Sequence, residues 1–265
     1  MNPITIVTGG TYGLGLSMTV ELARKGHRVV AMGLQRSQVS STAQGFDEIR
    51  QSAAQSGLSD QIDIVEADVS NAQDVQQVVD RAVARYGRID GLVNNAAIGP
   101  LGTVLDTDLD TYERIMAVNV RGVYLMSRAV IPHMARQGGG SIVNVGSGAG
   151  WGKPNMAVYA ASKGALFALS TAMAYDHFHQ HIRVNVALPG GGGIISGMSV
   201  GRVGGDESLF KSRKVPGTVA GRPLTGVDFA QTIAFLLSSD AQTISGTVID
   251  VGCFAHQGGP VPLQA

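Results

Sequence analysis

Short apolar runs rich in β-branched residues recur along the chain, and a segment with helical periodicity follows most of them. The apolar runs occupy residues 4–7, 29–32, 62–67, 91–94, 142–145, 183–188 and 247–251. The helical patterns occupy residues 14–25, 46–55, 72–86, 111–136, 157–177 and 227–238. Strands that alternate with helices form parallel sheets through crossover connections. The sequence therefore predicts an α/β fold in one domain over residues 1–265, with a doubly wound parallel sheet of about seven strands.

A glycine-rich turn at residues 8–15 joins the first apolar run to the first helical pattern. Its glycines follow the spacing Gly9-x-x-x-Gly13-x-Gly15. Glycines let the backbone approach a pyrophosphate, and the helix N-terminus offers free N–H groups and a positive dipole end. A glycine turn can also be no more than a tight connection. Between a strand and a helix, however, it predicts dinucleotide binding.

The end of the second apolar run bears on the choice between NAD and NADP. An Asp or Glu about twenty residues past the glycines would bind the ribose 2′-hydroxyl of NAD. The chain reads Gly33, Leu34, Gln35 and Arg36 there, with no acid. Arg36 suits a 2′-phosphate, so we favour NADP over NAD. The competing interpretation of Arg36 is an ordinary loop arginine.

Ser147, Tyr159 and Lys163 form the strongest candidate catalytic set. Ser147 follows the apolar run 142–145, and Tyr159 precedes Lys163 by one helical turn. Residues four apart on a helix share a face, so both side chains can point into one pocket. The Lys163 ammonium is expected to lower the pKa of Tyr159 from its usual ~10. A Tyr-x-x-x-Lys pair alone is weak, because most helical Tyr and Lys residues serve packing or the surface.

Three further polar residues are predicted at the same carboxyl edge of the sheet, where ligands of such folds bind. Asp68 follows the third apolar run and could accept a hydrogen bond from an adenine amine, or cap the next helix. Asn95 follows the fourth run, and its competing role is to satisfy neighbouring backbone groups. Asn119 lies inside a helical pattern, where Asn is unfavourable. We predict a local distortion there that holds a water molecule.

Residues 191–224 show no strong periodicity, apart from a short helix expected near residues 207–211. A long loop in a compact domain is usually functional, and we predict a substrate lid. The charged residues of this loop are Arg202, Lys211, Arg213, Lys214 and Arg222, with Asp206 and Glu207. An anionic substrate would suit them, but a solvated loop surface is the preferred interpretation.

Composition excludes several classes of protein. The formal net charge is +0, so no basic excess indicates nucleic-acid binding. Cys253 is the only cysteine, which excludes an intramolecular disulfide framework and fits a reducing, cytoplasmic compartment. No stretch approaches the roughly 18 uninterrupted apolar residues of a membrane span, and the first residues do not resemble a signal peptide. His177, His179 and His181 alternate across a predicted helix–strand turn, so we predict no metal site.

Taken together, these motifs resemble the short-chain dehydrogenase/reductase (SDR) family over about residues 3–253. The matching residues are Thr8 with the glycines after it, Asp68, Asn94, Asn95, Ala96, Asn119, Ser147, Tyr159, Lys163, Pro189 and Gly190. Each motif alone is weak, but this order and spacing are highly specific. The resemblance implies a Rossmann-type fold and an NAD(P)-dependent oxidoreductase that interconverts a secondary alcohol and a ketone.

The resemblance also implies a role for each site residue. Tyr159 is expected to be the general acid/base, and Lys163 to lower its pKa and bind the nicotinamide ribose. Ser147 would position the substrate carbonyl or hydroxyl, and Asn119 would anchor the water of a proton relay. The expected cofactor-binding residues are Gly9, Thr11, Tyr12, Gly13, Leu14, Gly15, Gly33, Leu34, Arg36, Asp68, Val69, Asn95, Ala96, Tyr159, Lys163, Pro189 and Gly190. The family's usual assembly implies a homotetramer, or a homodimer, through the long helices starting near residues 111 and 157.

Two positions depart from the family pattern. Ala97 stands where the family usually has Gly, and Ile194 stands where a Thr would contact the nicotinamide carboxamide. Ile194 cannot donate that hydrogen bond, whereas Ser196 could if the glycines before it form a wider loop. Two other functions stay open: a non-redox nucleotide-sensing regulator and an SDR-like lyase. The complete Ser147–Tyr159–Lys163 set argues against the first, and the retained glycine turn argues against the second.

Overall fold

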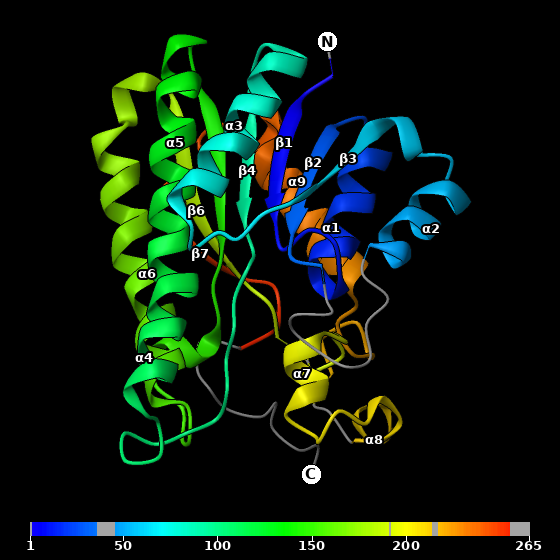
Figure 1. Ribbon diagram of the computed structural model, residues 1–265, viewed down its shortest axis with the longest axis vertical. Helices are drawn as coiled ribbons and strands as arrows, with labels where there is room; N and C mark the ends of the chain where they lie inside the picture. Colours follow the sequence, from blue (N-terminus) through cyan, green and yellow to red (C-terminus); the bar gives the residue numbers. More distant parts are fainter. Residues whose placement is uncertain (1, 36–45, 191, 214–216, 255–265) are drawn as a thin grey trace.

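A computed structural model describes residues 2–35, 46–190, 192–213 and 217–254 of the chain (Figure 1). Within these residues, seven strands form one sheet in the order β3-β2-β1-β4-β5-β6-β7. The strands are β1 Ile4–Thr8, β2 Arg28–Gly33, β3 Ile62–Glu66, β4 Gly91–Asn94, β5 Gly140–Val145, β6 Ile182–Leu188 and β7 Val248–Asp250. Neighbouring strands pair in parallel throughout. The predicted doubly wound parallel sheet is confirmed.

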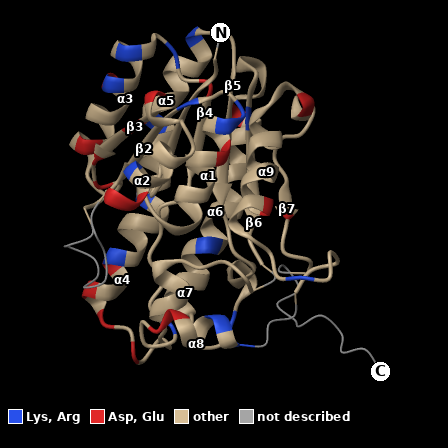
Figure 2. Ribbon diagram, turned by 90° about the vertical axis from the view of Figure 1, so that its right-hand side faces the viewer, with Lys and Arg blue, Asp and Glu red and all other residues tan. Residues whose placement is uncertain are grey.

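Helices cover both faces of this sheet (Figure 1). They are α1 Gly13–Arg24, α2 Asp47–Gln55, α3 Ala72–Tyr86, α4 Leu109–Met116, α5 Gly122–Arg136, α6 Ala157–Asp176, α7 Gly197–Gly201, α8 Glu207–Ser212 and α9 Gly226–Leu237. A π-helical turn spans Ala117–Arg121, and short 3₁₀ turns span Ser59–Gln61, Gly148–Trp151, Phe178–Gln180 and Ser239–Ala241. On the face shown in Figure 2, Lys and Arg are interspersed with Asp and Glu, in keeping with a net charge of +0.

Two apolar layers hold the helices against the sheet. On one face, Ile6, Val30 and Leu92 of the sheet pack with residues of α3, α5 and α6. On the other face, Val7 and Val143 pack with residues of α1 and α9. The central strands are therefore buried on both sides, which explains their β-branched composition. Each fully buried aliphatic or aromatic side chain contributes about 2 kcal/mol of transfer free energy.

The chain reverses its direction of winding between β1 and the central strand β4. β1 pairs with β2 on one side and with β4 on the other. In open α/β sheets, ligands bind outside the carboxyl ends of the strands at such a switch point. Helices α7 and α8 lie beyond these ends, at the bottom of Figure 1. Helix α7 with its N-cap Ser196 forms one wall of the candidate site, because Ser196 lies beside Gly13 and Met198 beside Gly99.

The helical pattern over residues 111–136, interrupted in the sequence by Gly122 and Pro132, is interrupted in the structure only in its first part. The structure divides it into α4, the π-helical turn Ala117–Arg121 and α5, while Pro132 lies inside α5 without ending it. The turn contains Asn119, so the distortion expected at this residue is confirmed. The short helix expected near residues 207–211 is also confirmed as α8. Helix α7 was not predicted, because it has only 5 residues and is defined by its cap rather than by apolar periodicity.

Candidate active site

The glycines of the turn between β1 and α1 stand where a side chain would be strained or would overlap the backbone. Gly9 and Gly13 have φ angles of +59° and +54°, the left-handed region that favours glycine. A Cβ atom on Gly15 would lie 1.8 Å from the Gly9 carbonyl oxygen. Thr11 and Leu14 are buried, whereas Tyr12 precedes the helix and is half-buried. The backbone of the turn is therefore tightly folded at the helix N-terminus, as a pyrophosphate site requires.

Thr8 and Asn95 lock this turn to the end of β4. The Asn95 Nδ2 atom donates to the carbonyl oxygens of Thr8 and Gly9, both at 3.0 Å. The Thr8 Oγ1 atom accepts from the backbone N–H groups of Asn95 and Ala96, at 2.9 and 3.0 Å. The competing role predicted for Asn95, satisfying backbone groups, therefore describes its contacts. The part played by the Thr8 side chain was not predicted.

The ends of β2 and β3 form the next part of the site. A Cβ atom on Gly33 would lie 2.5 Å from the Thr11 Oγ1 atom, which brings the glycine turn and β2 together. Leu34 is half-buried, and the Gln35 backbone N–H donates to Glu66 at 3.3 Å. Arg36, predicted to meet a 2′-phosphate, lies outside the described residues.

Asp68 and Val69 follow β3 at the same edge. The Asp68 Oδ1 atom accepts from the backbone N–H and the hydroxyl of Ser70, at 2.8 and 2.7 Å. The alternative role of capping α3 is wrong, because Asn71 accepts from the first N–H groups of that helix. Val69 is buried, and a Cβ atom on Gly122 would lie 2.9 Å from its Cγ2 atom.

Asn119 is fully buried at the π-helical turn, and its side chain hydrogen-bonds with protein groups. The Nδ2 atom donates to the Ile98 carbonyl oxygen at 2.8 Å and to the Ser162 hydroxyl at 3.0 Å. The Oδ1 atom accepts from the Ile98 N–H at 2.9 Å. Asn119 thus ties the segment after β4 to α6, the helix that carries Tyr159. Both side-chain N–H groups of Asn119 are therefore used within the protein.

Ser147, Tyr159 and Lys163 come together beyond the carboxyl end of β5. Ser147 caps the 3₁₀ turn Gly148–Trp151, and its hydroxyl accepts from the Ala149 N–H at 3.2 Å. Tyr159 and Lys163 lie in the first two turns of α6 and are buried, with exposed fractions of 6% and 3%. The Lys163 Nζ atom donates to the Val145 carbonyl oxygen at 2.8 Å and lies 5.9 Å from the centre of the Tyr159 ring.

Burial is the main influence on the pKa values of Tyr159 and Lys163. It raises the pKa of Tyr159 above its usual value, while hydrogen bonding with Ser147 and the positive charge of Arg202 act in the opposite direction. The expected lowering of the Tyr159 pKa by Lys163 is therefore not what the structure shows. Burial also lowers the pKa of Lys163 to about 8, because a charged ammonium loses its hydration there.

The segment after β6 lies against the glycine turn. Pro189 and Gly190 are half-buried, and a Cβ atom on Gly252 would lie 2.1 Å from the Gly190 Cα atom. Ser196 lies beside Gly13, since a Cβ atom there would be 3.3 Å from the Ser196 Cα atom. The Ser196 hydroxyl caps α7 by accepting from the Ser199 N–H at 3.1 Å. Ser196 is therefore next to the predicted cofactor site.

Gly99, Met198 and Arg202 pack around Tyr159, and the last two lie in the predicted substrate lid. A Cβ atom on Gly99 would lie 2.8 Å from the Tyr159 Cδ2 atom and 2.9 Å from the Met198 Sδ atom. The Arg202 Cζ atom lies 5.2 Å from the centre of the Tyr159 ring. The preferred interpretation of Arg202 as part of a solvated loop surface is wrong, because its side chain packs in the site. The basic residues of the loop were the only signal, and they did not single out Arg202.

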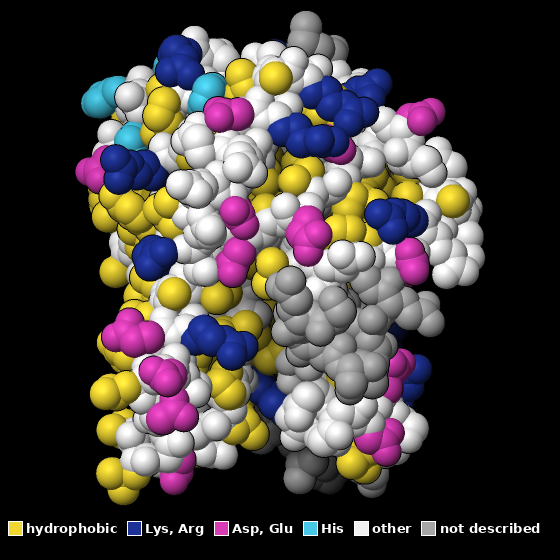
Figure 3. Space-filling view, viewed as in Figure 1, with side chains coloured by type: hydrophobic (Ala, Val, Ile, Leu, Met, Phe, Trp, Pro, Cys, Tyr) yellow, Lys and Arg dark blue, Asp and Glu magenta, His cyan; other side chains and the backbone are white. Residues whose placement is uncertain are grey.

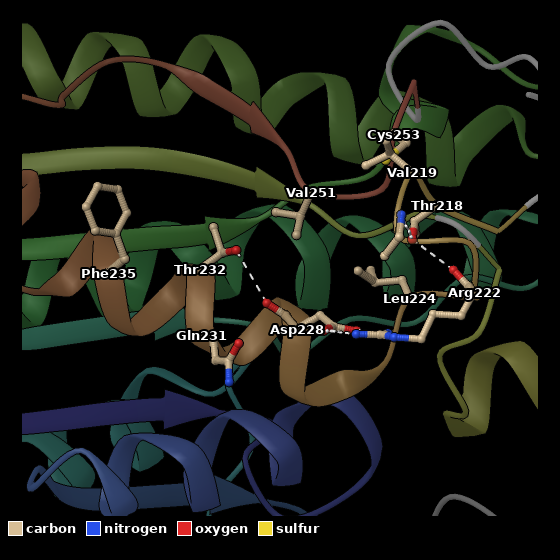
Figure 4. Close-up of a pocket in the computed structure, with 11 residues that line it drawn as sticks. Thr218, Val219, Arg222, Leu224, Asp228, Gln231, Thr232, Phe235, Val251 and Cys253 are labelled. Carbon is tan, nitrogen blue, oxygen red and sulfur yellow. Dashed lines mark hydrogen bonds and ion pairs between the residues drawn. The ribbon is translucent and has the colours of Figure 1, made fainter.

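A separate hollow of about 460 Å³ is bounded by α9, residues 218–224 and residues 251–253 (Figure 4). It is lined by Thr218, Val219, Ala220, Arg222, Leu224, Asp228, Gln231, Thr232, Phe235, Val251 and Cys253. None of the candidate catalytic residues lines it.

No helix among the described residues is long and apolar enough to span a membrane. The same part of the chain contains no group of three or more His, Cys, Asp or Glu side chains placed to bind a metal.

Comparisons with known proteins agree with this geometry. The short chain dehydrogenase family matches residues 3–198. The chain is 36% identical to 2-(S)-hydroxypropyl-CoM dehydrogenase 3 of Xanthobacter autotrophicus, covering 97% of this chain and 96% of the relative. It is 35% identical to cyclopentanol dehydrogenase of Comamonas sp., covering 96% and 97%. A crystal structure of 3-ketoacyl-(acyl-carrier-protein) reductase from Brucella melitensis complexed with NADH superposes with a TM-score of 0.79, at 30% identity, over 96% of this chain and 98% of the other.

Proposed function

Because the chain belongs to the short-chain dehydrogenase/reductase family, we propose that it interconverts a secondary alcohol and a ketone with a nicotinamide cofactor. The observation that carries the proposal is the buried Tyr159 hydroxyl, which interacts with Ser147 at the carboxyl edge of the sheet. The named relatives act as alcohol dehydrogenases or a ketoacyl reductase. A small carbonyl or alcohol is therefore the proposed substrate.

The glycine turn fits a dinucleotide. Gly9 and Gly13 adopt positive φ angles, and any Cβ atom on Gly15 would overlap the backbone. The helix N-terminus and these glycines would hold the pyrophosphate, and Asp68 and Val69 the adenine end. Lys163 would bind the nicotinamide ribose. When bound, the cofactor supplies or accepts the hydride.

The chain's own residues control the proton. In carbonyl reduction, Ser147 donates a hydrogen bond to the substrate oxygen, and Tyr159 transfers its proton to that oxygen. Burial raises the pKa of Tyr159, so the phenol holds its proton at neutral pH and is ready to act as the acid. Alcohol oxidation needs the phenolate, so its rate should rise with pH while reduction is favoured at neutral pH. The Asn119 turn would return protons through water.

Replacing Tyr159 with Phe tests the proposal. We expect reductase activity, followed by nicotinamide absorbance over a screen of ketones and alcohols, to fall by about 10³-fold. Cofactor binding, measured by fluorescence titration, should persist. Tyr175→Phe is the matched control, since Tyr175 lies on the same helix and is 79% exposed. Unchanged turnover in Tyr159→Phe would reject Tyr159 as the acid.

The preferred cofactor is proposed to be NADP(H), because residues 33–36 carry no acid for a ribose 2′-hydroxyl and end in Arg36. The measurement is kcat/KM with NADPH and with NADH on one substrate. We expect NADPH to be preferred, and Arg36→Gln to reduce that preference. A strong preference for NADH in the wild-type enzyme contradicts the assignment.

We further propose a single-domain, cytoplasmic homotetramer, with a homodimer as the alternative and the segment 191–224 as its substrate lid. Exposed apolar side chains gather over α4 and α6, at the left edge of Figure 3. They include Leu109, Tyr112 and Tyr175. Sedimentation equilibrium tests the assembly, and a monomer at micromolar concentration would contradict it. Cell fractionation tests the location.

A further inference from the structure

Arg202 directly follows α7, and its side chain reaches the proposed catalytic tyrosine. The guanidinium carbon lies 5.2 Å from the centre of the Tyr159 ring, and its positive charge acts to lower the pKa of the phenol. Gly99 and Met198 pack against the same ring, as the close approach to a Cβ on Gly99 shows. Arg202 therefore stands beside the place where a substrate carbonyl would meet Tyr159.

The guanidinium of Arg202 has few acceptors for its five N–H donors. The Nη2 atom donates to the Gly99 carbonyl oxygen at 3.3 Å and contacts the Met198 sulfur at 3.4 Å. The Nε atom is buried and has no hydrogen-bond partner. Over the described part of the chain, no carboxylate forms an ion pair with Arg202.

Other arginines of this chain show what a purely structural role looks like. Arg81 donates to both carboxylate oxygens of Asp63, at 2.8 and 2.7 Å. Arg222 donates to both carboxylate oxygens of Asp228, at 2.6 and 2.7 Å. A partly desolvated guanidinium without such a partner is costly. It is retained where an anion from outside the protein completes its hydrogen bonds.

We propose that Arg202 binds the carboxylate of the substrate, so that the enzyme acts on an oxo acid and the corresponding hydroxy acid. The planar guanidinium suits a bidentate carboxylate. Because the guanidinium carbon lies 5.2 Å from the centre of the Tyr159 ring, the carboxylate must lie within a few bonds of the reacting carbon, as in 3-oxo and 4-oxo acids. This inference rests on the proposed oxidoreductase function and narrows its substrate class.

The test compares acids with their neutral esters. The probes are 3-oxobutanoate, 4-oxopentanoate and the methyl ester of each, reduced by the full-length enzyme with NADPH or NADH. We expect the wild-type enzyme to prefer each acid, and Arg202→Gln to lower kcat/KM for the acids by about 100-fold, mainly through KM. The esters should change by less than about 3-fold, since they form no charge-assisted hydrogen bond. Arg202→Lys should restore part of the acid activity.

Arg213→Gln is the matched control, because Arg213 lies on the same segment and is exposed. It should leave the ratio of acid to ester activity unchanged. Equal losses for acid and ester in Arg202→Gln, or no preference for the acid in the wild-type enzyme, overturn the inference while the oxidoreductase function stands. If the wild-type enzyme reduces no ketone of any kind, the proposed function fails and the inference with it. Calorimetric titration of 4-oxopentanoate gives a second readout, in which Arg202→Gln must weaken binding.

Discussion

The cofactor side and the substrate side of the proposed site differ in how fully their polar groups are satisfied. On the cofactor side, the Asn95 amide donates to two backbone carbonyl oxygens at 3.0 Å, and Thr8 accepts from two backbone N–H groups. On the substrate side, the Arg202 Nε atom is buried without a partner. The first side is complete as protein structure, whereas the second leaves hydrogen bonds to be made.

This difference separates two ways of building a binding site. The glycine turn is shaped by backbone contacts that admit no Cβ atom, so its form does not depend on a ligand. On the substrate side, α7 is a short helix whose first turn is held by hydrogen bonds between Ser196 and Ser199. Next to it, the buried Arg202 Nε atom has no hydrogen-bond partner. Substitutions on the cofactor side should therefore lower the free energy of unfolding, and those on the substrate side should weaken substrate binding.

The largest effect is expected for Gly15→Ala. The new Cβ atom would lie 1.8 Å from the Gly9 carbonyl oxygen, so the turn and α1 must separate. We expect the free energy of unfolding in urea to fall by about 3 kcal/mol, together with loss of cofactor binding. Gly201→Ala is the control on the substrate side, because nothing lies within 4 Å of a Cβ there. If the two variants are equally stable, the proposed difference between the cofactor side and the substrate side is contradicted.

Lys163→Met gives the next largest effect, with the opposite sign on stability. Burial lowers the pKa of Lys163 from 10.5 to about 8, so below pH 8 the folded protein carries a costly buried charge. Removing that charge should stabilise the folded protein by about 3 kcal/mol. Losing the hydrogen bond to the Val145 carbonyl oxygen should destabilise it by about 1 kcal/mol. We expect the variant to be about 2 kcal/mol more stable at pH 7, and to lose turnover.

The pH dependence distinguishes this explanation from better packing. Between pH 8 and 10.5, the folded wild-type protein has released the Lys163 proton while the unfolded chain still binds it. Wild-type stability therefore rises with pH in this window, and the advantage of Lys163→Met should shrink. Urea denaturation at pH 7, 9 and 10.5 measures it. A constant advantage contradicts the buried-charge account; exposed Lys153→Met serves as the control.

The sequence predicted elements whose ends are marked by local chemistry. Helix α3 has the predicted bounds because Asn71 caps its start and Gly87, with φ of +77°, ends it. The distortion at Asn119 was predictable because Asn competes with the helix for backbone groups. The position of Arg202 was not, because it depends on tertiary contacts that bring the end of α7 over the Tyr159 ring. Likewise, the pKa of Tyr159 is set by burial, which the Tyr–Lys spacing does not reveal.

The smallest effect is expected for Asp228→Asn. Asp228 lies in the first turn of α9, which follows the proposed lid at residues 191–224 (Figure 4). The carboxylate accepts from Arg222 at 2.6 and 2.7 Å and from the Thr225 N–H at 2.8 Å. These hydrogen bonds hold the pKa of Asp228 well below its usual value. We expect a loss of about 1 kcal/mol near neutral pH, because Asn keeps a capping oxygen but loses the charge.

A depressed carboxyl pKa stabilises the fold above the unfolded value of 3.8, and this contribution is lost on further acidification. The difference between wild type and Asp228→Asn should therefore fade below about pH 4. Glu207→Gln is the control, because its pair with Lys211 is exposed and should change stability by less than about 0.5 kcal/mol. Since the Arg222–Asp228 pair is saturated within the protein, kcat/KM should stay within about 2-fold in Asp228→Asn. A tenfold loss of kcat/KM without a change in stability would place Asp228 in substrate binding. Complete hydrogen bonding within the protein would then not separate structural residues from substrate-binding ones.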